Sequence, residues 1–293
     1  MSIKGEPAPS TTWRSLRSRS AIRLSLGLVL MAAGWSIMWG VDTYFNAFAF
    51  WSLWTGASLL AWTLGKTEYP GLRRHLQLAL LSVPLWWWFE LINERVQNWH
   101  YVLIFDYGPV QYGLLTSMAF STVVPAICAA SSMIRRASPP QEPGGWERPG
   151  NRRLALPLIA TGVVLQVAVV LFPTQLFPLV WVAPALVFDG LVASAGGRSL
   201  VRDLASGRWT DVLVIAAGGP ICGFFWEFWN YWSMPKWEYR IPYLGFWKIF
   251  EMPAAGYLGY VPFAWSVVQL VRWLDCLSVR SGGGLTTAIW KLR

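Results

Sequence analysis

The sequence predicts an all-α polytopic membrane protein with about eight transmembrane helices, arranged as two parallel four-helix repeats. Hydrophobic residues make up 55% of the 293 residues and charged residues only 13%. Soluble domains carry about 25% charged residues. Eight apolar stretches approach the roughly 20 residues that a helix needs to cross a bilayer. An ordered set of motifs also occurs twice, once in each half of the chain.

The predicted spans follow one another with short connections. In order they cover Leu24–Val41, Ala47–Leu64, Leu78–Val96, Val110–Ile134, Leu154–Leu171, Phe177–Ala195, Val212–Trp232 and Gly256–Leu274. The second, fifth and sixth spans are short, so a seven-span arrangement is the main alternative. The first span is longer than the apolar region of a typical signal peptide and has no clear cleavage site. We therefore interpret it as a retained anchor.

The segment between the two halves has the composition of a linker. Its sequence, RRASPPQEPGGWERPGNRR, is rich in Pro, Gly and charge and covers residues 135–153. The predicted organisation is a basic tail over 1–23, a first four-helix repeat over 24–134, the linker, a second repeat over 154–275 and a tail over 276–293.

The basic residues fall mostly on one side of the predicted spans. The N-terminal tail and span edge hold five, the loop 65–77 three, the linker five, the loop 196–211 three and the C-terminal end four. The other side holds only Arg95, Lys236, Arg240 and Lys248. Because Lys and Arg favour the cytoplasmic side, we expect a multi-pass inner-membrane protein with both termini in the cytoplasm.

The repeated motifs lie at the ends of the third and seventh spans and just beyond them. Each span ends in aromatic-rich sequence with E-x-x-N, in WWWFELIN and FFWEFWN, and a W-x-Y motif and then an acidic residue follow. The matched pairs are Glu90 and Glu227, Asn93 and Asn230, Trp99 and Trp237, Tyr101 and Tyr239, and Asp106 and Glu251. Four spans per half is an even number, so both repeats keep one orientation about an axis along the membrane normal.

The two glutamates are the first candidate catalytic groups. An acidic side chain inside a span is costly, so Glu90 and Glu227 are expected to face the interior of the bundle. Asn93 and Asn230 share their helical faces and can hydrogen-bond the carboxyl groups. A buried carboxyl is expected to hold its proton at neutral pH. The alternative is that each Glu–Asn pair only joins helices.

Aromatic side chains surround both motifs, and the chain holds 21 Trp, 10 Tyr and 15 Phe residues. A carboxylic acid can protonate an alkene, ring faces stabilise the resulting carbocation, and a dry cavity protects it from water. The expected substrate-binding set is Trp87, Trp88, Trp99, Tyr101, Trp226, Trp229, Trp237 and Tyr239, with Asp106 and Glu251 closing the site. Packing and interface anchoring also explain many Trp residues.

The aromatic-flanked glutamate in FFWEFWN resembles the W-E-aromatic signature of integral-membrane terpene cyclases. This group includes the fungal meroterpenoid cyclases and, more remotely, the bacterial lycopene-cyclase-like proteins. The resemblance covers the third and seventh spans. It implies a small multi-helix membrane protein that uses acidic side chains for metal-free, non-redox cyclisation. It also marks Glu227, and by repeat Glu90, as positions that handle protons.

Asp189, in the sixth span, is a candidate third acid without a counterpart in the first half. The alternative is that it is a residue at the end of the span or marks a helix break at Gly190. The sequence lacks the motifs that metal or nucleotide chemistry needs. The two His and three Cys make no zinc or haem pattern, and no nucleotide-binding fingerprint occurs. We expect no metal and no cofactor. The expected partners are the bilayer and a lipophilic small molecule rather than nucleic acid.

The leading interpretation is therefore a membrane enzyme that acts on an isoprenoid or related lipid by proton-initiated chemistry. A transporter remains an alternative because parallel repeats and intramembrane acids also suit transport. A non-catalytic membrane assembly factor is the third interpretation.

The distribution of basic residues makes a topology prediction. Reporter fusions after Gly145 should read cytoplasmic and fusions near Met234 should read external, because the positive loops favour one side. The measurement is the ratio of a cytoplasmic to an external reporter. A cytoplasmic signal near Met234 would overturn both the span count and the parallel repeats.

Overall fold

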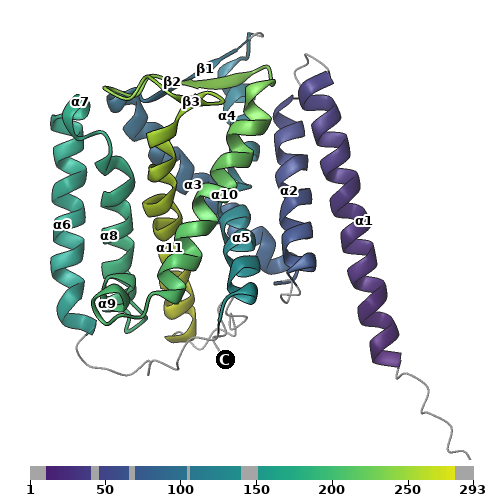
Figure 1. Ribbon diagram of the computed structural model, residues 1–293, viewed down its shortest axis with the longest axis horizontal. Coiled ribbons are helices and arrows are strands. Elements are labelled where there is room, and N and C mark those ends of the chain that lie inside the picture. The colour runs from purple at the N-terminus through teal and green to yellow at the C-terminus, as the bar shows by residue number, and fades with distance from the viewer. Residues whose placement is uncertain (1–10, 41–45, 66–69, 104–105, 140–150, 281–293) are drawn as a thin grey trace, which may run out of the picture.

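Most of the described chain is helical, and the long helices run side by side (Figure 1). The computed structural model describes residues 11–40, 46–65, 70–103, 106–139 and 151–280. In chain order the helices are α1 (Thr11–Gly40), α2 (Asn46–Leu64), α3 (Leu72–Val96), α4 (Pro109–Phe120), α5 (Val123–Ala137), α6 (Asn151–Leu171), α7 (Pro173–Leu176), α8 (Leu179–Ser194), α9 (Leu200–Ala205), α10 (Thr210–Tyr231), the 3-10 helix η1 (Ala254–Gly259) and α11 (Tyr260–Arg280).

Five helical stretches are long and apolar enough to cross a membrane. They are Arg19–Gly40, Pro109–Ala137, Arg153–Leu171, Thr210–Tyr231 and Ala254–Ser278. Helix α8 is apolar but shorter. Helices α2 and α3, which the sequence also predicts as spans, are outside this group, and α3 contains five charged residues. These features support an α-helical membrane protein.

Helices extend into three segments that the sequence analysis assigns to the tails and the linker. The predicted basic tail is helical from Thr11 because α1 extends well before the apolar stretch, and residues 1–10 lie outside the described chain. The ends of the predicted linker belong to α5 and α6, whereas residues 140–150 lie outside the described chain. Helix α11 continues to Arg280 and so includes the first residues of the predicted C-terminal tail. Residues 281–293 lie outside the described chain.

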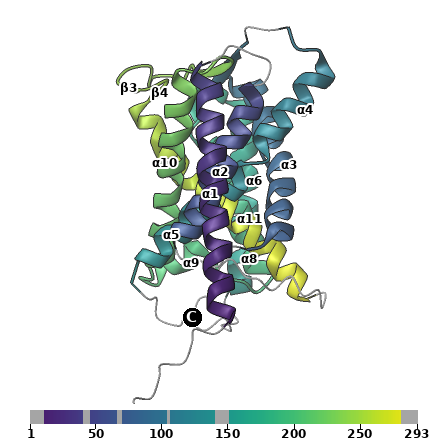
Figure 2. The same cartoon turned by 90° about the vertical axis from the view of Figure 1, so that its right-hand side faces the viewer.

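The fourth predicted span is broken into α4 and α5 at Ser121 and Thr122. Pro125 lacks an amide hydrogen, and its ring would clash with the carbonyl four residues earlier, at Ser121, in a continuous helix. The hydroxyls of Ser121 and Thr122 instead donate to the carbonyls of Met118 and Ala119, at 2.6 and 2.7 Å. The break turns α4 away from the axis of α5 (Figure 2).

Four short strands accompany the helices of this mostly helical chain, and two of them contain the W-x-Y motifs. Strand β1 (Trp99–Val102) pairs antiparallel with β2 (Lys236–Tyr239). A second small sheet joins β3 (Lys248–Ile249) to β4 (Met252–Pro253). All four strands gather at one end of the bundle, and α9 lies at the other (Figure 1 and Figure 2). We call these the strand end and the α9 end.

Two helix hairpins flank a central group of helices. Figure 1 shows α1 and α2 on one side, α6 and α8 on the other, and α3, α5, α10 and α11 between them. Glycines allow close packing in both hairpins. A Cβ on Gly56 of α2 would lie 2.6 Å from the carbonyl oxygen of Gly27 in α1, and a Cβ on Gly162 of α6 would lie 2.7 Å from that of Ala183 in α8.

This packing makes a stability prediction. Gly56→Ala should lower the stability by about 1–3 kcal/mol, because the added methyl group meets backbone that cannot move aside. Gly113→Ala in α4 is the matched control, since its Cβ would have no neighbour within 4 Å. Thermal unfolding in one detergent would compare them, and equal stability would contradict the close α1–α2 contact.

Candidate functional site

Glu90 lies in the last two turns of α3, and three ring donors hold its carboxyl group. The Oε1 atom accepts hydrogen bonds from Trp86 Nε1 at 3.0 Å, Trp99 Nε1 at 3.1 Å and the Tyr101 hydroxyl at 2.6 Å. Trp86 is one helical turn before Glu90 and therefore on the same face. An indole N–H can only donate, so this oxygen is fixed as an acceptor.

Glu227 lies at a corresponding place in α10 and is fully buried, with 0% of its surface exposed. Its Oε1 atom accepts hydrogen bonds from the hydroxyls of Tyr239 and Tyr260, each at 2.7 Å. Its Oε2 atom has no hydrogen-bond partner in the described part of the chain. Glu227 therefore has fewer donors than Glu90 and less contact with solvent.

The two asparagines have a role that the sequence analysis did not assign, since they hold backbone rather than carboxyl groups. Asn93 Nδ2 donates to the Trp99 carbonyl at 2.8 Å, and its Oδ1 accepts from the Asn98 and Trp99 amides at 2.9 and 3.3 Å. Asn230 Nδ2 donates to the Trp237 carbonyl at 2.7 Å, and its Oδ1 accepts from the Trp237 amide at 2.9 Å. Each E-x-x-N motif thus anchors the start of its W-x-Y motif.

The pairing of β1 with β2 joins the two motifs. Trp99 lies opposite Tyr239, Tyr101 opposite Trp237, and His100 opposite Glu238. Each tyrosine donates to the glutamate of its own half, Tyr101 to Glu90 and Tyr239 to Glu227. The sheet therefore brings both Tyr–Glu pairs to the strand end of the bundle.

Tyr260, at the start of α11, is held against α10 by two glycines. A Cβ on Gly223 would lie 2.3 Å from the Tyr260 ring, and a Cβ on Gly219 would lie 2.1 Å from the Tyr260 carbonyl oxygen. Any larger residue at either position would displace this tyrosine from Glu227. The G-x-x-x-G motif of α10 thus has a direct consequence for the site.

A cavity of about 530 Å³ lies between the two Tyr–Glu pairs. All five ring donors to the glutamates line it, namely Trp86, Trp99, Tyr101, Tyr239 and Tyr260. Trp181, Trp226 and Trp237 add further ring surface. Neither Glu90 nor Glu227 is among the lining residues. The carboxyl groups therefore lie behind a layer of rings and reach the cavity through hydroxyl and indole groups.

The strand tyrosines keep their protons over the physiological range. Burial, and then the negative charge of Glu90, raise the pKa of Tyr101 well above its usual value. Burial is also the largest cause of the raised pKa of Tyr239. Both phenols are therefore neutral and donate hydrogen bonds to the carboxyl groups behind them.

Of the predicted aromatic residues, Trp226 and the four W-x-Y side chains line the cavity, and three do not. Trp87 donates from Nε1 to the Ser117 hydroxyl at 2.9 Å. Trp88 is 43% exposed on the outside of α3. Trp229 is buried in a neighbouring cluster with Trp35 and Trp54, at ring-centroid distances of 6.2 and 5.0 Å. The structure thus removes these three from the expected substrate-binding set.

Asp189 does not join the two glutamates. Its carboxylate accepts hydrogen bonds from the Ser199 hydroxyl at 2.6 Å and the Leu200 amide at 2.7 Å, at the start of α9. Gln269 also donates to it. Gln269 is nine residues beyond Tyr260 on α11, about 13 Å along the helix. Asp189 therefore stabilises the opposite end of the bundle, and the third-acid expectation is wrong in position.

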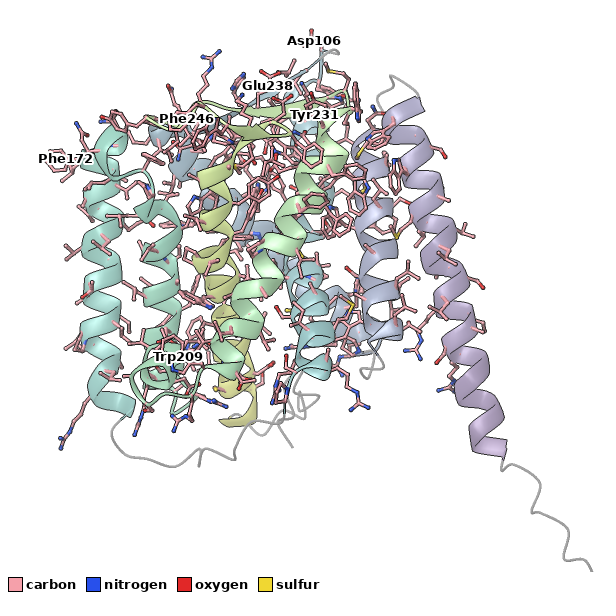
Figure 3. All side chains as sticks on the ribbon, viewed as in Figure 1. Asp106, Phe172, Trp209, Tyr231, Glu238 and Phe246 are labelled. Carbon is pink, nitrogen blue, oxygen red and sulfur yellow. The ribbon has the colours of Figure 1, made fainter. Side chains whose placement is uncertain are left out.

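The two acidic residues after the W-x-Y motifs also differ from the expectation. Asp106 is exposed at the strand end (Figure 3) and does not line the cavity. Glu251 does not line the cavity either, but its Oε1 atom lies 2.6 Å from Nζ of Lys236, which does. Only Glu251 therefore has a connection to the site.

Three site residues were missed by the sequence analysis. Trp86 had a usable signal, because it lies four residues before Glu90 on one helical face. No sequence signal pointed to Tyr260, because the first half of the chain has no matching tyrosine. No sequence signal pointed to Trp181 of α8 either. Its ring stacks on the rings of Phe89 and Trp99, at centroid distances of 5.1 and 5.8 Å.

Within the described residues, no group of three or more His, Cys, Asp or Glu side chains is placed to hold a metal ion. No family model, curated protein or solved structure matches this chain. The geometry of the site is therefore the basis for proposing what the protein does.

The asparagine anchors can be tested directly. Asn230→Ala and Asn93→Ala should each increase amide exchange in the strand that the side chain holds, because the backbone loses two or three hydrogen bonds. Each lost bond is worth about 0.5–1.5 kcal/mol. Hydrogen exchange with mass spectrometry measures this, with His100→Ala in the same sheet as the control. Unchanged protection of β1 and β2 would contradict the anchoring role.

Proposed function

We propose that the chain is an integral membrane enzyme that takes a lipophilic, isoprenoid-like lipid into the aromatic cavity and transforms it by metal-free acid–base chemistry. One observation carries the proposal: phenol hydroxyls bonded to both glutamates line a single cavity. A cavity walled mostly by rings and aliphatic side chains favours an apolar ligand. This lining also favours a lipid over the water-soluble solute that a transporter would carry.

The proton path runs through tyrosine. When Glu227 holds a proton, its carboxyl group donates to the phenol oxygen, and the phenol O–H turns toward the cavity. Proton transfer from the phenol to an alkene carbon forms a new C–H bond and leaves a carbocation, while the carboxyl proton moves to the phenol oxygen. The hydroxyls of Tyr239 and Tyr260 are both placed for this step, each 2.7 Å from Glu227.

The two glutamates suit opposite roles. Full burial and an oxygen without a partner favour the neutral acid at Glu227, because an ion there is poorly compensated. Three donors on one oxygen favour the carboxylate at Glu90. The Glu90–Tyr101 pair then accepts the proton that the carbocation loses. One proton enters and one leaves, so the net reaction is an isomerisation or cyclisation.

Ring faces stabilise the intermediate cation. The quadrupole of an aromatic ring attracts positive charge but does not capture it as a nucleophile would. Trp99, Trp181 and Trp226 present ring surface to the cavity from three different elements. The apolar lining also limits the water that would quench the cation.

The proposal also covers the number of membrane crossings, their arrangement as repeats and the side of the membrane on which the termini lie. We infer eight crossings as two parallel four-helix repeats, with both termini in the cytoplasm of an inner membrane. Support comes from the matching hairpins, α1 with α2 and α6 with α8, and from the matching contacts of Glu90 and Glu227. The beginning of α1 and the end of α11 both lie at the α9 end (Figure 1). Most basic residues are expected there as well.

The catalytic proposal predicts large losses of activity from small changes. Glu227→Gln and Glu90→Gln should each lower product formation by about 10²–10⁴-fold, because an amide keeps the size but cannot transfer the proton. Tyr260→Phe should lower it as well, since the hydroxyl is removed and the ring remains. Lipid profiling of cells with and without the protein identifies the product, which is then measured in membranes.

Glu94→Gln is the matched control, because Glu94 is exposed on the same helix and lies outside the cavity. It should keep full activity. Variants are compared at equal amounts of folded protein. Full activity of both Gln variants would reject acid–base catalysis and leave the glutamates as structural contacts.

A further inference from the structure

In the described wall of the cavity one side chain is basic, and two carboxylates bind it. Among the lining residues only Lys236, on β2, is basic. Its Nζ atom lies 2.6 Å from Glu251 Oε1 and 3.2 Å from Glu238 Oε1. Neither glutamate lines the cavity. The cavity therefore meets the lysine from one side, while the carboxylates bind it from the other.

Lys236 is positively charged, and the carboxylates of Glu251 and Glu238 balance its charge. Burial alone would lower the pKa of Lys236, but its hydrogen bonds with Glu251 and Glu238 raise it. Charge-assisted hydrogen bonds of this kind are roughly twice as strong as neutral ones. An anionic headgroup would have to compete with two carboxylates for the same ammonium group.

The other polar groups in the wall are uncharged. Asn46, Asn98, Asn230, Ser233 and Thr116 contribute amides and hydroxyls. The strand tyrosines are neutral because their pKa values are raised. The described wall thus offers hydrogen bonds to a hydroxyl or carbonyl group, but no uncommitted positive charge for a phosphate or carboxylate.

The charge distribution at the strand end also disfavours binding of an anionic headgroup. The segments 86–112 and 226–260 contain six acidic residues and four basic residues. The acidic ones are Glu90, Glu94, Asp106, Glu227, Glu238 and Glu251, and without the neutral Glu227 five acidic residues still exceed the four basic ones. A cavity bordered by an excess of acidic groups lowers the local concentration of anions.

We propose that Glu251, with Glu238, determines specificity by neutralising Lys236, so that the cavity accepts uncharged lipids and excludes phosphorylated ones. This inference rests on the proposed function, since it names the substrate class of the same site. It assigns Glu251 a role outside the chemical step: the residue sets which headgroup can enter and transfers no proton.

The test is a binding comparison with the full chain in lipid nanodiscs. The probes are geranylgeraniol and geranylgeranyl monophosphate, which share one apolar chain and differ in headgroup charge. Quenching of Trp fluorescence, calibrated by native mass spectrometry, gives both dissociation constants. The single variants Glu251→Gln and Glu238→Gln each remove one of the two carboxylates that bind the lysine. The double variant combines Glu251→Gln with Lys236→Gln. Glu94→Gln removes an equal charge from the same end without touching Lys236.

The wild-type protein should bind the alcohol at least about 10-fold more tightly than the phosphate. Glu251→Gln should improve phosphate binding by about 10-fold, the size of one charge-assisted contact, and should leave alcohol binding unchanged. Glu238→Gln should give a smaller gain in the same direction, because its contact with the lysine is longer. The double variant should lose the gain, and Glu94→Gln should show none.

Phosphate binding equal to or tighter than alcohol binding in the wild type would overturn the inference and leave the proposed function standing. Unchanged phosphate binding in both Glu251→Gln and Glu238→Gln would overturn it as well. If the wild type binds neither probe, the proposed function fails at ligand uptake, and the inference falls with it. Alcohol binding by each variant shows that its cavity is still formed.

Discussion

The antiparallel pairing of β1 with β2 is the contact on which the candidate site depends. The strands come from opposite halves of the chain, and each is fixed to its own helix by an asparagine that holds both the amide and the carbonyl of a tryptophan. With these anchors in place, the pairing sets where Tyr101 and Tyr239 lie, and these tyrosines connect Glu90 and Glu227 to the cavity. A shift of one residue in the register would turn the tyrosine of one strand to the opposite face from the tyrosine of the other.

The two ends of the bundle are stabilised by different interactions. Rings and single hydrogen bonds dominate the strand end, whereas buried ion pairs dominate the α9 end. There Asp211 lies 3.2 Å from Arg135 of α5 and 3.4 Å from Arg272 of α11, and Asp203 lies 2.8 Å from Arg208. Buried charges are costly unless they are paired, so these contacts specify one arrangement of α5, α10 and α11. The charged end therefore fixes the helices whose other ends form the cavity.

The sequence predicts the helices well because apolar stretches of this length have few alternatives to a membrane-spanning helix. It also predicts that Glu90 and Glu227 are focal residues, since only function or a specific contact justifies an acid in such surroundings. It does not predict the strands, although WHYV and KWEY have aromatic and β-branched residues typical of strands. Tyr260 and Trp181 could not be found, because their roles depend on which helices become neighbours. The distance between Asp189 and the glutamates could not be predicted for the same reason, because it follows only from the packing of α8 against α11.

The central claim is that the two motifs build one cavity that holds a lipid. The most direct measurement is mass spectrometry of the lipids retained by the purified chain, compared with a variant whose cavity is filled. Ala119→Trp places a large ring at a residue that lines the cavity, and Leu114→Trp, at an exposed residue of the same helix, is the control. The account predicts about one uncharged lipid per chain in the wild type and in Leu114→Trp, and none in Ala119→Trp. The same retained lipid in Ala119→Trp, or no retained lipid in the wild type, would contradict it.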